Sequence, residues 1–203
     1  MQWAIALEWY LLMEDPWRCA MTSDHPNGGA FYRYPEIIAL LMDRELRRDT
    51  MARLPHGLEE RTVLKDIDRE YTLSEVAIIT RAAPARILGL THKGHLGAGA
   101  DADITIYAPD KDIRRMFERP RWVIKGGVVA AEDGDIQKEV FGETFFVEPG
   151  FDQNSLPGIK DWFEEHYTIS FSNYPVDTHY VDQPHVEVLV VVVVLVVVVL
   201  IYL

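Results

Sequence analysis

Cysteine is the scarcest residue type that bears on function, because Cys19 is the only one among 203 residues. A single cysteine excludes an intrachain disulfide, and it excludes an iron-sulfur cluster or structural zinc site held by several cysteines of this chain. The neighbours Ala20 and Met21 are apolar, and nothing nearby in the sequence would lower the thiol pKa. We therefore expect a buried strand thiol rather than a reactive nucleophile.

Basic residues are also few relative to acidic ones. Lys and Arg number 20 against 32 Asp and Glu, which gives a formal net charge of −12. Nucleic-acid binding requires concentrated positive charge, so we expect no nucleic-acid partner. The acidic balance is typical of a soluble cytoplasmic protein. Two short clusters of arginine residues occur in the sequence, and both predict solvated helix faces. They are Arg44, Arg47 and Arg48, and Arg114 and Arg115.

A secretory signal is not expected at the start of the chain. Residues 1–13 lack a basic beginning, carry Glu8 within the apolar stretch and lead to Asp15-Pro16 instead of a small-residue cleavage site. Apolar residues around much of the circumference predict a packed helix over 3–13, which Pro16 ends.

One long hydrophobic run is present, from Val188 to Leu203. Its sixteen residues fall short of the ~18 to 20 that span a bilayer, and valine favours extended structure. Three interpretations of segment 186–203 are open: an artefact of the sequence, which we favour, an aggregation-prone strand, or a membrane anchor.

The order of the remaining patterns predicts an α/β fold. A short strand over 18–23 is followed by helices over 35–51, around 58–68 and over 72–89, the last opening with the capping-box pattern Thr72-Leu73-Ser74-Glu75. Beyond Gly89 short β-rich runs follow, at 104–107, 122–125, 128–130 and 144–147, with Gly126-Gly127 as a hairpin turn. A further helix is expected over 152–167.

The segment Thr22-Ser23-Asp24-His25-Pro26-Asn27-Gly28-Gly29 is the strongest local indication of a site. A carboxylate at the carboxyl end of a barrel strand points into the mouth where substrates bind, and the following turn leaves it uncrowded. Asp, Pro, Asn and Gly are also ordinary turn residues, so Asp24 as a simple turn cap remains the alternative.

The downstream phrases favour the catalytic interpretation. Thr80-Arg81-Ala82-Ala83-Pro84-Ala85-Arg86-Ile87-Leu88-Gly89 and then Gly97-Ala98-Gly99-Ala100-Asp101-Ala102-Asp103 resemble the end of the amidohydrolase superfamily, where a last barrel strand bearing a metal-binding Asp leads through a helix into a small β-sandwich. Ala82-Ala83 replace the more usual residues before Pro84.

Several other phrases narrow the resemblance to the family of formylmethanofuran dehydrogenase A subunits. They are Gln2-Trp3-Ala4-Ile5, Asp15-Pro16-Trp17-Arg18, Tyr34-Pro35, Leu40-Leu41-Met42-Asp43 and Arg69-Glu70-Tyr71. The resemblance implies a C-terminal fragment with four parts: the end of an amidohydrolase-type TIM barrel (1–90), part of a β-sandwich (91–150), a C-terminal extension (151–185) and the Val-rich tail (186–203).

The resemblance also implies residue roles. Asp24 would bind one metal of a binuclear zinc site and transfer the proton between water and leaving group, with the remaining ligands outside this chain. For His25 we favour an organising role in the loop, with substrate contact or metal ligation as alternatives. Asn27, Gly28 and Gly29 would bind the formamide or carboxylate of the substrate, or would form only a turn.

The implied activity is the condensation of formate with methanofuran, or the reverse hydrolysis of formylmethanofuran, in methanogenic one-carbon metabolism. The implied partners are methanofuran, formate and further subunits that hold the pterin and iron-sulfur centres. An alternative is the α subunit of the bacterial formyltransferase/hydrolase complex. An alternative of another class is a truncated, non-catalytic scaffold or interaction module.

Other residues that could carry chemistry have simpler interpretations. His92 and His95 stand in a polar connection without carboxylate or cysteine company, and we expect exposed loop residues. Asp101 and Asp103 are expected to accept hydrogen bonds from turn amides. The aromatic residues near the start, Trp3, Trp9, Tyr10 and Trp17, predict core or subunit-interface positions.

Overall fold

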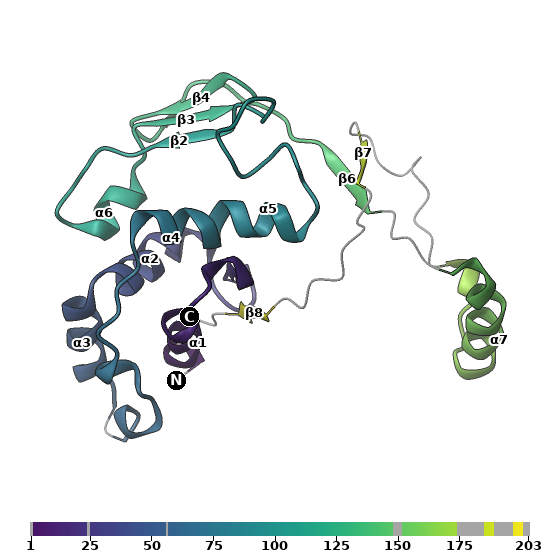
Figure 1. Ribbon diagram of the computed structural model, residues 1–203, viewed down its shortest axis with the longest axis horizontal. Helices are drawn as coiled ribbons and strands as arrows, with labels where there is room; N and C mark the ends of the chain where they lie inside the picture. Colours follow the sequence, from purple (N-terminus) through teal and green to yellow (C-terminus); the bar gives the residue numbers. More distant parts are fainter. Residues whose placement is uncertain are drawn as a thin grey trace. The chain divides into compact units, whose positions relative to one another are not determined.

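The computed structural model describes residues 2–23, 25–55, 57–147, 152–173, 185–188 and 197–200. The chain divides into two compact units, Met1–Val140 with Val194–Leu203, and Phe141–Val193 (Figure 1). Helices and short strands occur in both units, which agrees with the predicted α/β class.

The first unit begins as predicted, with a helix that leads into a short strand. These elements are α1 (Gln2–Leu12), the 3-10 turn η1 (Pro16–Arg18) and β1 (Cys19–Thr22). Asp15 caps η1 by accepting a hydrogen bond from the Trp17 N–H. The predicted strand over 18–23 is confirmed.

One hydrophobic core lies beneath β1. Buried side chains of α1, β1 and the next helices form it, with Tyr10, Cys19, Leu41 and Ile79 each fully buried. Burial raises the pKa of the Cys19 thiol, which confirms a buried thiol without the low pKa of a nucleophile. Trp9 and Trp17 are exposed within this unit, so only part of the predicted aromatic set belongs to the core.

The helix predicted over 35–51 is two helices, and this prediction was wrong. A 3-10 turn, η2 (Phe31–Arg33), leads into α2 (Tyr34–Met42), and α3 (Arg44–Ala52) follows. Asp43 separates them with extended backbone angles and caps α3 by accepting from the Leu46 N–H. The apolar spacing continues across Asp43, so the hydrophobic pattern gave no sign of the break.

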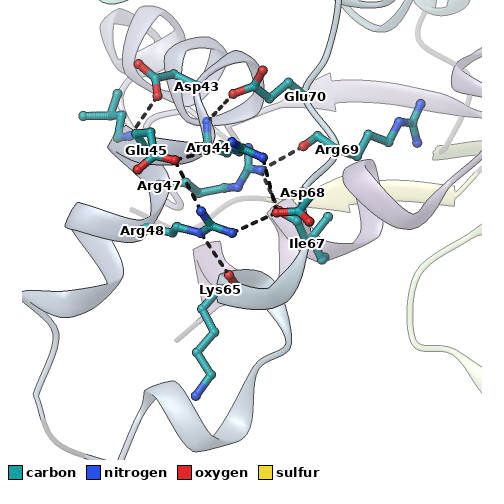
Figure 2. A network of polar contacts seen from close by, with 11 residues as sticks. Asp43, Arg44, Glu45, Arg47, Arg48, Lys65, Ile67, Asp68, Arg69 and Glu70 are labelled. Atoms are coloured by element: carbon teal, nitrogen blue, oxygen red, sulfur yellow. Dashed lines mark hydrogen bonds and ion pairs between the residues drawn. The ribbon is translucent and has the colours of Figure 1, made fainter.

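Arg47 contradicts the predicted solvated face, because its side chain is buried (Figure 2). Its guanidinium donates to the carbonyl oxygens of Leu40 (2.8 Å), Leu41 (3.4 Å), Ile67 (3.0 Å) and Arg69 (2.8 Å). Arg44 and Arg48 stay partly exposed and share the Asp68 carboxylate. Burial lowers the pKa of Arg47, and the carbonyl oxygens compensate for the lost hydration.

The prediction of a helix around 58–68 is also wrong, because only two single turns form there, η3 (Glu59–Arg61) and η4 (Leu64–Asp66). The carbonyl groups of Ile67 and Arg69 accept from Arg47, and that of Lys65 accepts from Arg48 (3.5 Å), as Figure 2 shows. In a helix, backbone N–H groups would donate to these carbonyl oxygens; here Arg47 and Arg48 of α3 donate to them instead.

The helix predicted over 72–89 is confirmed, with a local widening. It comprises α4 (Leu73–Ala77), one π turn, η5 (Ile78–Ala82), and α5 (Ala83–Ile87), and the predicted capping box between Thr72 and Glu75 is present. Pro84 has no N–H, so it cannot donate to the Thr80 carbonyl oxygen, which accepts instead from Arg81 at 3.0 Å. A backbone bond from Ala83 to Ile78 forms the wider turn.

The rest of the first unit is a small antiparallel sheet with strand order β2-β3-β4-β5. Its strands are β2 (Ile104–Ile106), β3 (Trp122–Lys125), β4 (Val128–Glu132) and β5 (Asp135–Ile136). Gly126 and Gly127 both have positive φ, which confirms the predicted two-residue hairpin turn. Between β2 and β3, α6 (Ile113–Glu118) contacts α2 and adds Ile113 and Phe117 to the edge of the core.

The second unit holds the predicted helix of the C-terminal extension. Its elements are β6 (Thr144–Val147), η6 (Gln153–Ser155), α7 (Leu156–His166), η7 (Phe171–Asn173) and β7 (His185–Val188), and β6 pairs with β7 in parallel. In the Val-rich tail, β8 (Val197–Leu200) pairs in parallel with β1, so that Met21 stands opposite Val199. Among the described residues, no helix has the length and apolar character needed to cross a membrane.

Candidate functional site

The candidate site begins where β1 ends. Cys19 and Met21 point into the core, and Ser23, immediately after the strand, is also buried. Asp24, the predicted catalytic and metal-binding residue, lies outside the described residues. The chain then forms a turn over 25–28, and the His25–Pro26 peptide bond is cis. The strand followed by a turn agrees with the predicted backbone on both sides of Asp24.

His25 is exposed and contacts the far side of the loop. Its Nδ1 atom accepts a hydrogen bond from the Phe31 N–H at 3.4 Å, and its ring meets the Phe31 ring edge-on, with centroids 5.0 Å apart. These contacts fit the favoured role of organising the loop. Asn27 is exposed, while Gly28 and Gly29 are buried, and a substrate-binding role for these residues stays a prediction.

Two tyrosines that the sequence did not single out as site residues anchor α1, Tyr10 by its bond to β1 and Tyr71 by its bond to the α1 main chain. The Tyr10 hydroxyl donates to the carbonyl oxygen of Ala20 at 3.0 Å, and the Tyr71 hydroxyl donates to the main-chain carbonyl oxygen of Tyr10. Burial raises the pKa of both phenols, so both stay protonated as donors. Tyr71 stands in one of the family phrases, whereas Tyr10 would have been recognisable only as an aromatic residue on a buried helix face.

Arg69 fixes the carboxyl end of α1. Its guanidinium donates to the carbonyl oxygens of Leu11 (2.9 Å) and Met13 (2.6 Å), pairs with Glu75 at 2.6 Å, and lies over the Tyr71 ring. Burial alone would raise the pKa of Glu75, but hydrogen bonds from Thr72 and Arg69 outweigh it and lower that pKa. The capping box of α4 is therefore connected through Arg69 to the helix that carries Tyr10.

Of the two histidines after α5, His95 is an exposed loop residue as predicted, whereas His92 is half-buried and lies beside a carboxylate. The Nε2 atom of His95 lies 3.0 Å from the Thr91 carbonyl oxygen, and its Nδ1 atom accepts from the Gly97 N–H at 3.1 Å. The Nε2 atom of His92 lies 3.8 Å from the Asp101 carboxylate. These contacts are local to the connection between α5 and β2.

Asp103 accepts from the turn amide of Gly126 at 2.9 Å, as predicted, and it also joins an ion cluster. Its Oδ2 atom lies 3.1 Å from the Lys93 Nζ atom and 3.0 Å from the Lys125 Nζ atom, and Asp101 contacts the same Lys93 at 2.6 Å. Burial by itself would raise the pKa of Asp103, but the Gly126 amide and the two lysines outweigh it and hold the pKa at about 2. We assign this cluster a structural role in the hairpin.

A metal centre needs several ligands around one point. Within the part of the chain that the structure describes, no group of three or more His, Cys, Asp or Glu side chains is placed to share an ion. The described residues therefore do not form a catalytic zinc site by themselves, since such a site takes about three protein ligands.

The fold and the strand-then-turn arrangement agree with the comparison to known protein families. The chain belongs to the amidohydrolase family, whose model matches residues 2–131. This matched region includes β1 and the turn over 25–28.

Within that family, two curated proteins are closely similar to the chain. It is 42% identical over 176 residues to the A subunit of the formyltransferase/hydrolase complex Fhc of Methylorubrum extorquens, which covers 87% of this chain and 32% of that protein. It is 40% identical over 193 residues to protein FwdA of Methanocaldococcus jannaschii, which covers 89% of this chain and 34% of that protein. These similarities confirm the family resemblance found in the sequence phrases.

A solved structure agrees. The crystal structure of the formyltransferase/hydrolase complex (FhcABCD) from Methylorubrum extorquens, in complex with methylofuran, contains a chain that matches this one with a TM-score of 0.77 and 38% identity. The match covers 92% of this chain and 35% of that chain. The chain thus spans about a third of the length of the relatives it matches.

Proposed function

We propose that this chain is the part of a metal-dependent formamide hydrolase that contains the catalytic residue Asp24. The hydrolase would be the A subunit of a formylmethanofuran dehydrogenase or of the related formyltransferase/hydrolase complex. The observation that carries the proposal is the 40–42% identity to FwdA and to the Fhc A subunit over almost nine-tenths of the chain. The strand-then-turn geometry around position 24 supports it.

The proposed reaction is the hydrolysis of an N-formyl group on a furan-type carrier amine, or its reversal. In hydrolysis the bond between the formyl carbon and the nitrogen breaks, the hydroxyl group of water joins the carbon, and a proton reaches the nitrogen. The products are formate and the free amine. Methanofuran is the proposed carrier, and the solved relative is in complex with methylofuran.

Asp24 is proposed to act in two ways. A bound divalent metal, proposed as one of two zinc ions, would lower the pKa of water, and Asp24 would be one of the ligands. The carboxylate would also accept the proton of that water and deliver it to the departing nitrogen. His25 would hold the loop, and Asn27, Gly28 and Gly29 would contact the formyl group or the carboxylate product.

The proposed organisation follows the expected division of the chain. Residues 1–90 would complete a TIM barrel, residues 91–150 would belong to a small β-sandwich, 151–185 would form an extension and 186–203 a tail. In a cytoplasmic complex, further subunits would bind this one. Pterin and iron-sulfur subunits among them would define the dehydrogenase of methanogenic metabolism, and a formyltransferase without redox subunits would define the hydrolase complex. Genes adjacent to this one distinguish the two.

The test is Asp24→Asn in the whole-length protein, assayed for hydrolysis of formylmethanofuran. The amide is nearly isosteric but is a poor base, so we expect kcat to fall by about 10² to 10⁴, with the thermal unfolding midpoint unchanged. Asp135→Asn, at an exposed position of β5, is the matched control and should retain activity. Asp24→Asn activity within a few-fold of wild type would exclude the proposed role.

A non-catalytic scaffold is the competing function for the chain as it stands, because the further metal ligands that the family resemblance implies lie outside residues 1–203. Metal analysis of the purified chain separates the two. A scaffold should retain no zinc through dialysis, whereas two zinc ions per chain together with formamide hydrolysis would show that the chain is catalytic by itself.

A further inference from the structure

Helix α7 of the second unit is short, and its apolar side chains are exposed. It has 11 residues, and an isolated helix of fewer than about 12 to 15 residues is marginally stable in water. The structure describes every residue of α7, and none of them is buried. Ile159 is 48% exposed and Trp162 is 53% exposed. The stability of α7 therefore calls for another surface that covers these side chains.

The residues of α7 fall on two sides of the helix. At 3.6 residues per turn, one side collects Ile159, Trp162, Phe163 and His166. The opposite side collects the charged residues, which are Lys160, Asp161, Glu164 and Glu165. An amphipathic helix of this kind is a common means of recognition, in which the apolar side lies in a hydrophobic groove of a partner protein.

Aromatic rings on α7 and after it hold one another in place. The Trp162 ring is stacked on the His166 ring with centroids 4.5 Å apart, and the Phe163 ring is stacked on the Tyr167 ring at 4.7 Å. Phe171 of η7 meets Phe163 edge-on at 5.6 Å. We call these residues the aromatic cluster. Rings that are already ordered lose little side-chain entropy on binding, and tryptophan and tyrosine carry much of the energy of many interfaces.

The charge beside the aromatic cluster indicates the kind of partner. Glu165 follows Trp162 by three positions, so the two are neighbours on the helix surface. The basic residue of α7, Lys160, pairs with Glu164 at 3.9 Å. Acidic residues repel anionic lipid, and a second copy of this chain would bring the same acidic residues. The complementary surface is an apolar groove of another protein with basic residues at its rim.

The comparisons place α7 in the part of the chain that is shared with A subunits. The amidohydrolase family model matches residues 2–131, so α7 lies beyond it. The match to the Fhc A subunit covers 87% of the 203 residues, and it therefore extends past residue 173. A helix that lies outside the family model but within the match to a subunit of a complex is suited to a role in assembly.

We propose that α7 and the aromatic cluster dock in an apolar groove with a basic rim on another subunit of the complex. The inference rests on the proposed function, under which further subunits bind this chain. It adds the surface that one of those subunits recognises.

The test is Trp162→Ala in the whole-length protein, with the purified subunits encoded by the adjacent genes as binding partners. Truncation of a central interface tryptophan typically weakens binding strongly, so we expect the Kd to rise about tenfold or more. The helical content and the thermal unfolding midpoint of the unbound protein should not change. A photo-cross-linking amino acid at position 162 should form a covalent product with one of these subunits.

Two further variants of α7 test the two sides of the helix. Lys160→Ala is the matched control, because it removes a long side chain from the charged side and leaves the aromatic cluster intact. Its Kd should be unchanged or lower, since the charged side becomes more acidic. Glu165→Lys keeps the apolar side and should raise the Kd about tenfold at low salt, with a smaller rise at high salt.

Each outcome bears on a different statement. A Trp162→Ala or Glu165→Lys protein with the wild-type Kd would overturn the inference. A Trp162→Ala protein that unfolds at a lower temperature when unbound, or that does not fold, would also overturn it, because Trp162 would then pack against its own chain. A cross-link between two copies, or sedimentation of the protein with phosphatidylserine vesicles, would do the same. A wild-type protein that binds none of these subunits would overturn the proposed function itself, whereas an inactive Asp24→Asn protein with the wild-type Kd would support both.

Discussion

The Nη2 atom of Arg47 lies 2.8 Å from the carbonyl oxygen of Arg69, and this hydrogen bond joins segments that are 22 residues apart (Figure 2). Arg69 in turn holds the carboxyl end of α1. A buried arginine of α3 is therefore connected, through one backbone carbonyl group, to the helix that supports β1.

Replacing Arg47 with Met should destabilise the chain strongly. The carbonyl oxygens of Leu40, Ile67 and Arg69 lose the Arg47 donor, while that of Leu41 still accepts from the Tyr71 N–H at 2.9 Å. An unsatisfied buried group costs roughly 1 to 3 kcal/mol, so we expect the free energy of unfolding to fall by about 3 kcal/mol or more. Urea denaturation of the purified chain measures the loss.

Arg48→Met is the matched control on the same helix. Arg48 pairs with Glu45 and Asp68, but its side chain is 42% exposed, and exposed ion pairs contribute about 1 kcal/mol or less. Equal losses for the two variants would contradict the assignment of Arg47 as the central donor.

The comparison of Arg47 with Arg48 also shows how far sequence patterns reach. Helical spacing identified the apolar face of 35–51, and the short strand before Asp24 was recognisable from its β-prone residues and the turn that follows. The burial of Arg47 could not be recognised from the sequence, because its acceptors are backbone carbonyl groups. Every residue carries such a group, so no sequence pattern distinguishes the ones that bind Arg47.

The same limit applies to the candidate site. Asp24 to Gly29 could be proposed from the order of strand, carboxylate and glycines together with the family phrases. The contact between Tyr10 and Ala20 depends on how α1 packs against β1, and helix periodicity reports only that Tyr10 faces the core. Contacts of this kind, to a backbone group of another element, therefore required the three-dimensional structure.

Gly94 should be intolerant of a side chain. Its φ is +78°, and an added Cβ atom would lie 2.7 Å from the Ala85 Cβ atom and 2.8 Å from the Arg81 carbonyl oxygen. Left-handed backbone costs an alanine about 1 to 2 kcal/mol, and overpacking adds typically 1 to 3 kcal/mol. Gly94→Ala should therefore lower the free energy of unfolding by about 2 to 5 kcal/mol.

Gly99→Ala separates the two contributions. Gly99 has a similar φ of +85°, but an added Cβ atom there would meet nothing within 4 Å. Its substitution should cause only the backbone loss of about 1 to 2 kcal/mol. Thermal unfolding of the two variants side by side gives the difference, and a Gly94→Ala protein no less stable than Gly99→Ala would show that the loop does not pack closely on η5 and α5.

Asp103 should make the stability of the chain depend on acid pH. Burial opposes its ionisation, but the Gly126 amide and the two lysines hold its pKa at about 2, below the ordinary value of 3.8. A depressed carboxyl pKa adds stability that is fully present above about pH 4 and is lost as the pH falls through about 2. The side chain is 30% exposed, so after solvent screening we expect a contribution of about 1 to 2 kcal/mol at pH 7.

The measurement compares the wild-type chain with Asp103→Asn by urea denaturation between pH 7 and pH 3. The asparagine oxygen can still accept from Gly126 but gives Lys93 and Lys125 no counter-charge, so the variant should be less stable at pH 7. Because the wild-type carboxylate gains protons on unfolding, the gap should narrow by about half between pH 5 and pH 3. Asp135→Asn, on an exposed edge of the same sheet, should show no such gap. A gap that stays constant down to pH 3 would mean that the ionised Asp103 carboxylate does not hold the hairpin to the two lysines.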